Sequence, residues 1–167
     1  NFPKRTYQQS QGDDLYRRSV YTHWQRQYLH PAMLAFDAST REECTVERPV
    51  SNTPLQALVL LNDPQFVETG RVLAAKMLRE ADPAADSRLD YLVKHVLMRA
   101  PSPEEREILL AVQRKHQQQF ADDVDAAKKL VSTGAAPVSP DLEAAEWAAW
   151  TSVARIIYNL QETINRY

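Results

Sequence analysis

The sequence predicts an all-α fold, an irregular bundle of about seven helices with one long, ordered, charged loop. Three observations lead to this fold class. Glycine occurs only three times in 167 residues, whereas folds rich in strands need more glycines for their tight turns. The chain has ten prolines, and several directly follow Ser, Thr or Asp, which is the arrangement expected where a helix begins. No segment shows the two-residue alternation of a half-buried strand.

The first predicted helix covers residues 13–30. Its aromatic and aliphatic residues recur at helical spacing, and Pro31 is expected to end it because proline disrupts a continuing helix. Residues 1–12 precede it as an extended lead-in. In an amphipathic helix the apolar side chains face the core, and here they are Leu15, Tyr16, Val20, Tyr21, Trp24 and Tyr28.

The next predicted helix begins within the sequence Asn-Thr-Pro. Thr53 is expected to be the N-cap, Pro54 the first helical residue, and Gln56 the residue that completes a capping box. A second start, Asp63–Pro64, follows so soon that this helix must be short and must end in a sharp turn. The apolar run at 57–61 is therefore expected to be buried on most sides.

The helix that starts at Pro64 is expected to run to about Glu80. Gly70 lies inside it, where a glycine costs about 1 kcal/mol relative to alanine. Such a glycine marks either the close approach of another helix or a tolerated surface position, and the sequence leaves both interpretations open.

Four further helices are predicted in the remainder of the chain. A capping box of Ser102 and Glu105 starts one of them, and Gly134 stops a short helix that begins near residue 122. The last begins at Ser139–Pro140 and can run to the end of the chain. One apolar stripe is predicted within 86–99 and a core stripe in the last helix; their members are Leu89, Leu92, Val93, Val96 and Leu97, and Trp147 and Trp150.

The predicted loop, residues 36–52, is dense in charge and has no helical or strand period. In one interpretation its ion pairs and hydrogen bonds hold it against the helices, because a long loop has many backbone groups to satisfy. In the other, carboxylates beside guanidiniums bind a polar ligand such as sugar hydroxyls, with Asp or Glu as general base. The first is favoured because no convergent acid–base pair is visible. The candidate residues are Asp37, Arg41, Glu42, Arg48 and Asn52.

A second candidate surface is the mixture of aromatic and basic residues that includes Arg17, Arg18 and Trp24. Such a mixture can form a stacking platform for sugars or bases. More often it is an amphipathic helix with its aromatic residues in the core and its arginines in solvent. The net charge of −2 disfavours a nucleic-acid partner, which normally requires a basic excess.

Metal and haem sites are not expected in this chain. The four histidines are widely separated and form no pair with ligand spacing. Cys44 is the only cysteine, so the chain cannot supply the CxxCH motif that attaches haem covalently. No apolar run approaches the roughly 18 residues of a membrane-spanning helix.

Several motifs occur together in a fixed order: Tyr-Arg-Arg-Ser, Phe-Asp-Ala, Asn-Thr-Pro-Leu-Gln-Ala-Leu and Leu-Leu-Asn-Asp-Pro. With these pieces and those at 99–105, 143–155 and 159–166, the chain resembles the C-terminal half of a family known as domain of unknown function 1553. The resemblance predicts one helical domain over 1–167, with the upstream half of the family domain missing. Thr163 departs from the family pattern, which usually has an aromatic residue there.

The resemblance implies a domain of large secreted planctomycete proteins that lies downstream of c-type cytochrome domains, and hence a periplasmic or extracellular location. The implied partners are the upstream half of the same domain and the cytochrome domains, which would carry the haem. The leading hypothesis is a non-catalytic helical module that packs on these upstream domains and helps shape a site there. The alternative is part of an envelope enzyme acting on polysaccharide or another polar substrate, with the loop at 36–52 lining its cleft.

Overall fold

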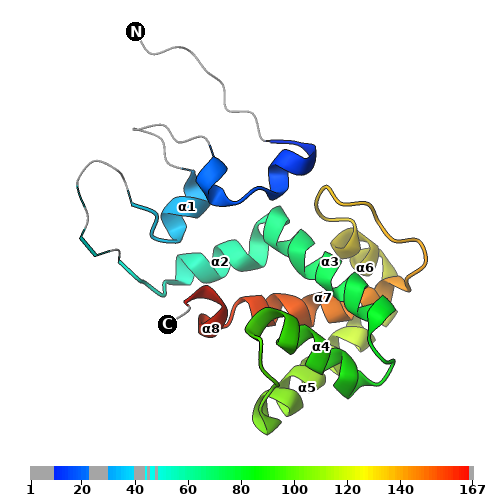
Figure 1. The fold of residues 1–167 in the computed structure, drawn as a ribbon. Coiled ribbons are helices and arrows are strands. Elements are labelled where there is room, and N and C mark those ends of the chain that lie inside the picture. The colour runs from blue at the N-terminus through cyan, green and yellow to red at the C-terminus, as the bar shows by residue number, and fades with distance from the viewer. Residues whose placement is uncertain (1–9, 23–29, 40–43, 45, 48, 166–167) are drawn as a thin grey trace. The chain divides into compact units, whose positions relative to one another are not determined.

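The computed structural model describes residues 10–22, 30–39, 44, 46–47 and 49–165 (Figure 1). These residues form eight α-helices and two short 3₁₀-helices, and no strand occurs among them. The predicted all-α fold class is confirmed. The chain divides into two compact units, residues 1–51 and residues 52–167, and each is described by itself.

The first unit contains the 3₁₀-helices η1 (Gly12–Tyr16) and η2 (Ser19–Tyr21) and the helix α1 (Pro31–Ala35). The single helix predicted for 13–30 is wrong, because extended backbone at Arg17 and Arg18 separates η1 from η2. Neither 3₁₀-helix has a side-chain cap, and short helices depend on tertiary packing for their stability. Pro31 begins α1, and residues 23–29 of the predicted helix lie outside the described residues.

Packing in the first unit also differs from the prediction. The predicted core residues Tyr16, Val20 and Tyr21 are 61%, 74% and 63% exposed. Among the described residues up to 51, Ala35 alone is buried. Trp24 and Tyr28 lie outside the described residues. The helical spacing of Tyr16, Val20 and Tyr21 therefore does not indicate a core among the described residues of this unit.

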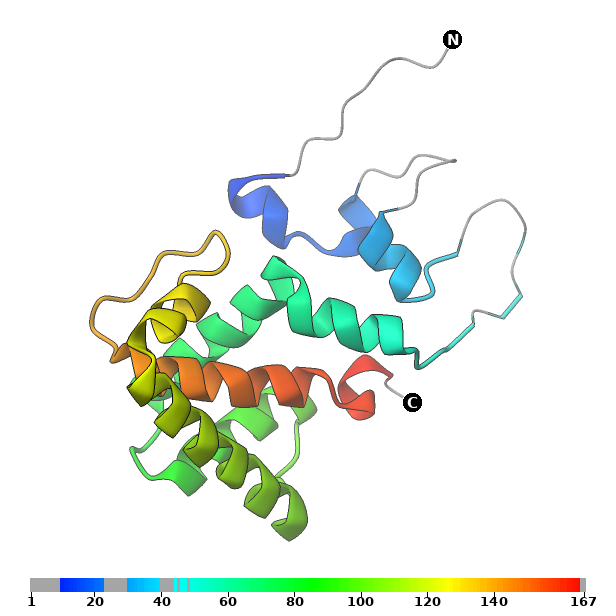
Figure 2. The same cartoon turned by 180° about the vertical axis from the view of Figure 1, so that it is seen from behind.

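The second unit consists of helices α2 to α8. Helix α7 lies at its centre, in contact with α3, α5 and α6 (Figure 2). No helix of the described chain is both long and apolar enough to cross a membrane. The bounds of the helices are α2 (Pro54–Asn62), α3 (Pro64–Glu80), α4 (Ala85–Leu97), α5 (Pro103–Asp122), α6 (Val124–Val131), α7 (Ala144–Tyr158) and α8 (Gln161–Ile164).

The starts of α2 and α3 follow the predicted caps. The Thr53 hydroxyl accepts the Gln56 N–H at 3.3 Å, and the Gln56 side chain accepts the Thr53 N–H at 3.1 Å. Asp63 ends α2 and caps α3 by accepting the Gln65 N–H at 2.9 Å. These side chains satisfy N–H groups that have no partner inside the helix.

The burial predicted for 57–61 is wrong. Within this run Leu60 is buried at 6% exposure, whereas Leu58 is 56% exposed. Leu55, one turn earlier, is 57% exposed. One face of α2 packs within the second unit, and the apolar face that carries Leu55 and Leu58 is left uncovered. The prediction failed because an apolar sequence does not show how many neighbouring helices are present to cover it.

The start of α5 joins three segments through the predicted capping box. The Ser102 hydroxyl accepts the Glu105 N–H at 3.2 Å, and Glu105 accepts the Ser102 N–H at 2.8 Å. Arg99 donates to both oxygens of Glu105 at 2.7 Å and to Glu162 of α8. One guanidinium therefore connects the end of α4 and the starts of α5 and α8.

The last predicted helix corresponds to α7, which begins later and ends earlier than the sequence predicted. Its start lies at Ala144, not at Ser139–Pro140, because Glu143 is the N-cap and accepts two backbone N–H groups. Arg79 also binds Asp141 through two hydrogen bonds, of 2.8 and 3.0 Å, which holds the preceding residues outside the helix. The helix ends at Tyr158, and the short α8 follows.

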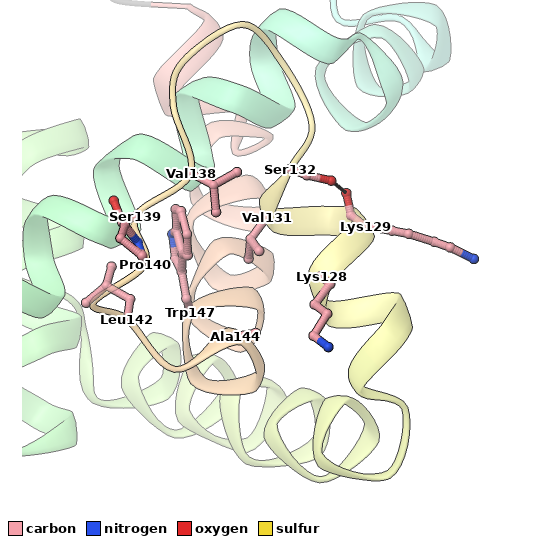
Figure 3. A pocket seen from close by; sticks show the side chains of 10 residues that line it. All are labelled: Lys128, Lys129, Val131, Ser132, Val138, Ser139, Pro140, Leu142, Ala144 and Trp147. Atoms are coloured by element: carbon pink, nitrogen blue, oxygen red, sulfur yellow. Dashed lines mark hydrogen bonds between the residues drawn. The ribbon is translucent and has the colours of Figure 1, made fainter.

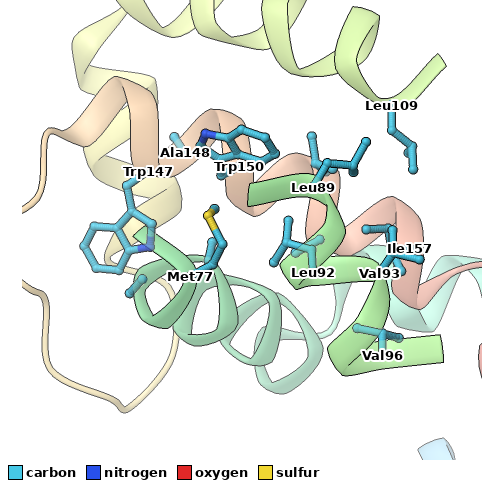
Figure 4. Packing of buried hydrophobic residues seen from close by; sticks show 14 of the residues in the cluster. Met77, Leu89, Leu92, Val93, Val96, Leu109, Trp147, Ala148, Trp150 and Ile157 are labelled. Atoms are coloured by element: carbon cyan, nitrogen blue, oxygen red, sulfur yellow. The ribbon is translucent and has the colours of Figure 1, made fainter. Parts of the chain in front are cut away.

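The core of the second unit surrounds α7 (Figure 4). Trp147 and Trp150 are each 1% exposed, as the predicted core stripe requires, and Met77 of α3 and Leu89 of α4 are fully buried. The α4 stripe is confirmed for four of its five members, and Leu97 is partly buried. Gly70 is buried, and a Cβ at this position would lie 3.1 Å from the Arg155 Cγ, so this glycine marks the close approach of α3 and α7.

Replacing Met98 with glycine is expected to stabilise the second unit. Met98 ends α4 in the left-handed conformation, with φ of 59°, and its side chain is 74% exposed. Glycine adopts this conformation without the steric cost of a Cβ, so Met98→Gly should raise the free energy of unfolding in urea by about 0.5 to 1 kcal/mol. Met98→Ala keeps the Cβ and is the matched control, for which little change is expected. A loss of stability in Met98→Gly would contradict this interpretation.

Glu105 is expected to make stability depend on pH. The hydrogen bonds from Arg99, and then that from the Ser102 backbone, lower the pKa of Glu105 from 4.5 to about 2. The stabilising contribution is therefore fully present above pH 4.5 and is lost as the pH falls through about 2. The Glu105 side chain is 32% exposed, so water screens the effect, and we expect a loss of about 1 kcal/mol between pH 7 and pH 3.

Urea unfolding at the two pH values measures this loss. Glu105→Gln should reduce the difference between pH 7 and pH 3, because the side chain no longer titrates. Glu107→Gln, at an exposed position of the same helix, is the control and should leave the difference unchanged. An equal pH dependence in wild type and Glu105→Gln would be the contrary result.

Candidate functional site

The charged loop contains one described polar cluster, formed by Asp37 and Ser51. The Asp37 carboxylate accepts the Ser51 N–H at 2.8 Å and the Ser51 hydroxyl at 2.8 Å from each oxygen. Asp37 has a φ of 58°, a left-handed conformation that Asp tolerates better than most residues. Asp37 and Ser51 are 14 positions apart in the sequence, so this contact closes the loop between them. The Asp37 carboxylate therefore has a structural role here.

The other predicted loop residues are not brought into this cluster by the described contacts. Arg41, Glu42 and Arg48 lie outside the described residues, so their pairing with Asp37 stays a prediction. Asn52 is exposed and directly precedes Thr53, the N-cap of α2. Ser51, which the sequence analysis did not single out, supplies the donors. A short hydroxyl residue beside a helix start is too common in loops to stand out in a sequence.

The predicted aromatic–basic surface is described only in part. Arg17 forms an ion pair with Asp14 at 2.8 Å, and both side chains are about 60% exposed, at 61% and 60%. Arg18 is exposed in the extended backbone between η1 and η2, and Trp24 lies outside the described residues. Exposed ion pairs contribute only about 0 to 1 kcal/mol, so this pair does not by itself define a site.

No group of three or more potential metal ligands gathers among the described residues. Cys44 is exposed and has a free thiol. His116 has a buried Nδ1 with no hydrogen-bond partner in the described part of the chain. Burial, followed by the positive charges of Lys115 and Arg155, lowers the pKa of His116, so its imidazole is neutral at pH 7. A general base normally needs an orienting partner, and no described carboxylate orients this ring.

Two buried charges of α3 form a polar site that the sequence analysis missed. Glu68 is 3% exposed and Arg71 is fully buried. Glu68 accepts the N–H groups of Ala135 and Ala136 at 2.7 and 2.9 Å. Arg71 donates to the carbonyl oxygens of Ala136 and Pro137 at 2.7 and 3.2 Å. We call this arrangement the Glu68–Arg71 clamp; it holds residues 132–143, the connection between α6 and α7.

The clamp has a recognisable origin in the sequence. Glu68 and Arg71 are three residues apart, so they project from the same face of α3, and this face is otherwise made of small and apolar buried residues. Buried charges require hydrogen-bonding partners, and here the backbone of the connection provides them. Two charged residues within a buried helical stripe are the sequence signal from which buried hydrogen bonds such as those of the clamp could have been predicted.

Gly134 allows the connection to pass close to Glu68. Its φ is +99°, and a Cβ at this position would lie 2.6 Å from both the Cβ and the Cδ of Glu68. The sequence predicted that Gly134 stops α6, and α6 does end shortly before it, at Val131. The second reason for glycine here is the contact with α3, which lies far away in the sequence.

Trp147 connects the clamp to a surface cavity. Its indole N–H donates to the Arg71 carbonyl oxygen at 2.8 Å, and the Arg71 guanidinium carbon lies 5.5 Å from the centre of the ring. The cavity, of about 430 Å³, opens between the end of α6, the connection and the start of α7 (Figure 3). We call it the Trp147 pocket. Its lining residues are Lys128, Lys129, Val131, Ser132, Val138, Ser139, Pro140, Leu142, Ala144 and Trp147.

A partly buried arginine forms a further structural contact in the second unit. Arg155 of α7 donates through Nη2 to the Leu61 carbonyl oxygen at the end of α2. Burial lowers the pKa of Arg155, and burial also raises the pKa of the nearby Tyr158 in the same helix. The contact ties α2 to α7 through a backbone acceptor, as the clamp ties the connection to α3.

The fold and these contacts define an all-α protein whose described buried charges bind its own backbone. The model of a family described as "PSD1: Protein of unknown function (DUF1553)" matches residues 1–113. The chain belongs to this family, as the ordered motifs in its sequence indicated. The motifs at 143–155 and 159–166 and the Trp147 pocket lie beyond the matched residues. No curated protein and no solved structure matches the chain.

Gly134→Ala is expected to destabilise the second unit strongly. Alanine would meet both an unfavourable φ and the Glu68 side chain, so the clamp would have to open, leaving buried charges without partners. Loss of one partner from a buried charged pair typically costs about 3 to 5 kcal/mol, and we expect a loss of at least about 3 kcal/mol in urea unfolding.

Gly70→Ala is the matched control for this prediction. The same change inside α3 meets the flexible Arg155 side chain and gains helix propensity, so it should shift the free energy of unfolding by less than about 1 kcal/mol. If both substitutions change the free energy of unfolding equally, the clamp does not depend on the close contact between Gly134 and Glu68.

Proposed function

We propose that this chain is a non-catalytic helical module of a larger extracytoplasmic protein of the planctomycete, cytochrome c-associated type. It packs on the upstream domains of that protein and helps shape a site there. In this proposal the second unit is the stable scaffold. The first unit gains its core from the upstream half of the family domain, and any haem belongs to the cytochrome domains.

The observation that carries this proposal is the apolar surface of the first unit. Ala35 is its only buried residue among those described. The large apolar residues that it leaves more than half exposed are Tyr16, Val20, Tyr21, Leu34, Val46 and Val50. A unit of this size cannot offset the conformational entropy of folding without burying apolar surface. A partner that covers these residues supplies that burial.

The charges of the described residues support a structural role over catalysis. Asp37 binds Ser51, and Glu68 and Arg71 bind the connection. Arg99 joins Glu105 and Glu162, and Arg106 joins Asp86 and Asp90. Catalysis by acids and bases requires titratable groups that face a substrate, whereas each of these groups faces another part of the same chain.

Amide hydrogen exchange tests the proposal on the chain alone and together with the preceding segment of its parent protein. In the chain alone, the amides of η1, η2 and α1 should exchange nearly as fast as in an unfolded peptide, since their packing is incomplete. Addition of the upstream segment should slow them on the order of tenfold or more. The amides of α3 and α7 should be protected in both samples and serve as the internal reference.

Surface variants locate the interface. Val20→Asp places a charge where the partner is expected to bury an apolar residue, and it should weaken association on the order of tenfold or more. Ile108→Asp makes the same change at an exposed position of α5 and should leave association unchanged. If the first unit is already as protected as α7 in the chain alone, the unit is self-sufficient and the proposal is wrong.

A further inference from the structure

We propose that the Trp147 pocket binds a small amphipathic carboxylate, a molecule with an apolar body and a single anionic group. The inference concerns the second unit alone and does not depend on the proposed upstream partner. It follows from three properties of the pocket: its size and apolar floor, its preformed wall, and the unpaired lysines at its rim (Figure 3).

The floor and wall of the pocket are largely apolar. Val131 is 3% exposed and Trp147 is 1% exposed, so they form the floor, and Val138 of the connection is half exposed above them. Figure 3 shows Val131, Val138 and Trp147 close together, with Leu142 and Pro140 beyond the indole. The volume of about 430 Å³ lies within the range of small-molecule sites. It is large enough for a two-ring aromatic group.

The wall of the pocket is fixed before any ligand binds. The connection carries Val138, Ser139 and Pro140, and the Glu68–Arg71 clamp holds the backbone directly before them through four hydrogen bonds. On the other side, Arg79 holds Asp141 through two more. A site that is already ordered avoids the entropy loss of ordering a loop on binding.

The rim provides positive charge. Lys128 and Lys129 are exposed in the last turn of α6, and neither forms an ion pair with a described residue. In Figure 3 the Lys129 side chain points away from Val131, Val138 and Trp147. Its flexible four-carbon stem can bring the ammonium group to a bound anion. Of the nearby carboxylates, Asp141 is bound by Arg79, Asp123 caps α6 and Glu143 caps α7. Asp125, in the first turn of α6, is the acid that reduces this positive potential.

The end of α6 does not repel an anion through bare carbonyl groups. The Lys129 carbonyl oxygen accepts the hydroxyls of Ser132 and Thr133 at 3.0 and 3.1 Å. The Lys128 carbonyl oxygen accepts the Ser132 N–H at 3.1 Å. These donors compensate the negative end of the helix dipole, and the lysines then determine the sign of the local potential.

The lining also restricts the class of ligand. A sugar requires many hydrogen-bonding groups, whereas the side-chain hydroxyls here are those of Ser132 and Ser139, and Ser132 already donates to Lys129. A polyphosphate or nucleic acid requires a wider basic surface, and the pocket has two lysines. An apolar group beside one carboxylate is the chemistry that matches both the floor and the rim.

The test compares 2-naphthylacetate with its neutral amide, 2-naphthylacetamide. Both have the same ring system, so their difference measures the contribution of the anion. In two-dimensional NMR of the full chain, the acid should shift the backbone amides of Ser132 and Val138 and the Trp147 indole N–H, with a Kd on the order of millimolar. The amide should bind about fivefold more weakly, and raising the salt concentration should reduce this difference.

Three variants locate the binding site. Lys128→Gln combined with Lys129→Gln should weaken binding of the acid about fivefold and leave that of the amide unchanged. Lys94→Gln removes an exposed lysine of α4 and should change neither affinity. Val138→Glu places a negative charge at a half-exposed position of the wall and should abolish binding of the acid. Circular dichroism and thermal melting establish that each variant is folded.

Other outcomes overturn the proposal. Equal affinity for acid and amide would mean that the lysines do not select an anion. Shifts confined to the first unit would mean that the probe binds only the exposed apolar residues there. If neither probe shifts the pocket residues, but the upstream segment of the parent protein does, the pocket is a protein interface and not a ligand site.

Discussion

The close contact between α3 and α7 is the constraint on which the second unit depends. Gly70 allows the two helices to approach so closely that a Cβ there would lie 3.1 Å from the Arg155 Cγ, inside ordinary van der Waals contact. At this distance the Trp147 indole reaches the backbone of α3 and donates to the Arg71 carbonyl oxygen. Trp150, one turn along α7, then fills the core that α4 and α5 cover. A larger residue at position 70 that kept the helices apart would weaken all of these contacts together.

The same contact explains why two charges can be buried in α3. Removing Glu68 and Arg71 from water carries a large desolvation penalty. The connection between α6 and α7 offsets it because its backbone presents N–H groups to Glu68 and carbonyl oxygens to Arg71. Fixing α7 against α3 places the connection where these groups can bond. The clamp thereby determines the wall of the Trp147 pocket.

The two units illustrate different relations between apolar sequence and burial. In α4 the helical stripe of apolar residues is buried almost as predicted, because α3, α5, α7 and α8 all contact this helix. In the first unit an equally apolar pattern leaves Val20 and Tyr21 in solvent. Periodicity shows which side chains share a face. It does not show whether a neighbour exists to cover that face, and in this unit the described residues provide none.

The sequence alone determined the local features of this protein. The caps at Thr53, Asp63 and Ser102 were predictable because each depends on residues within one turn, and the family was recognisable from the motifs around them. Only the tertiary structure decided the rest. Ser51 as the partner of Asp37, the unpaired face of α2 and the role of Glu68 all depend on segments distant in the chain. The Glu68 carboxylate bonds a backbone N–H 67 positions away, and any residue has a backbone N–H to offer except proline, so no residue type marks the partner in advance.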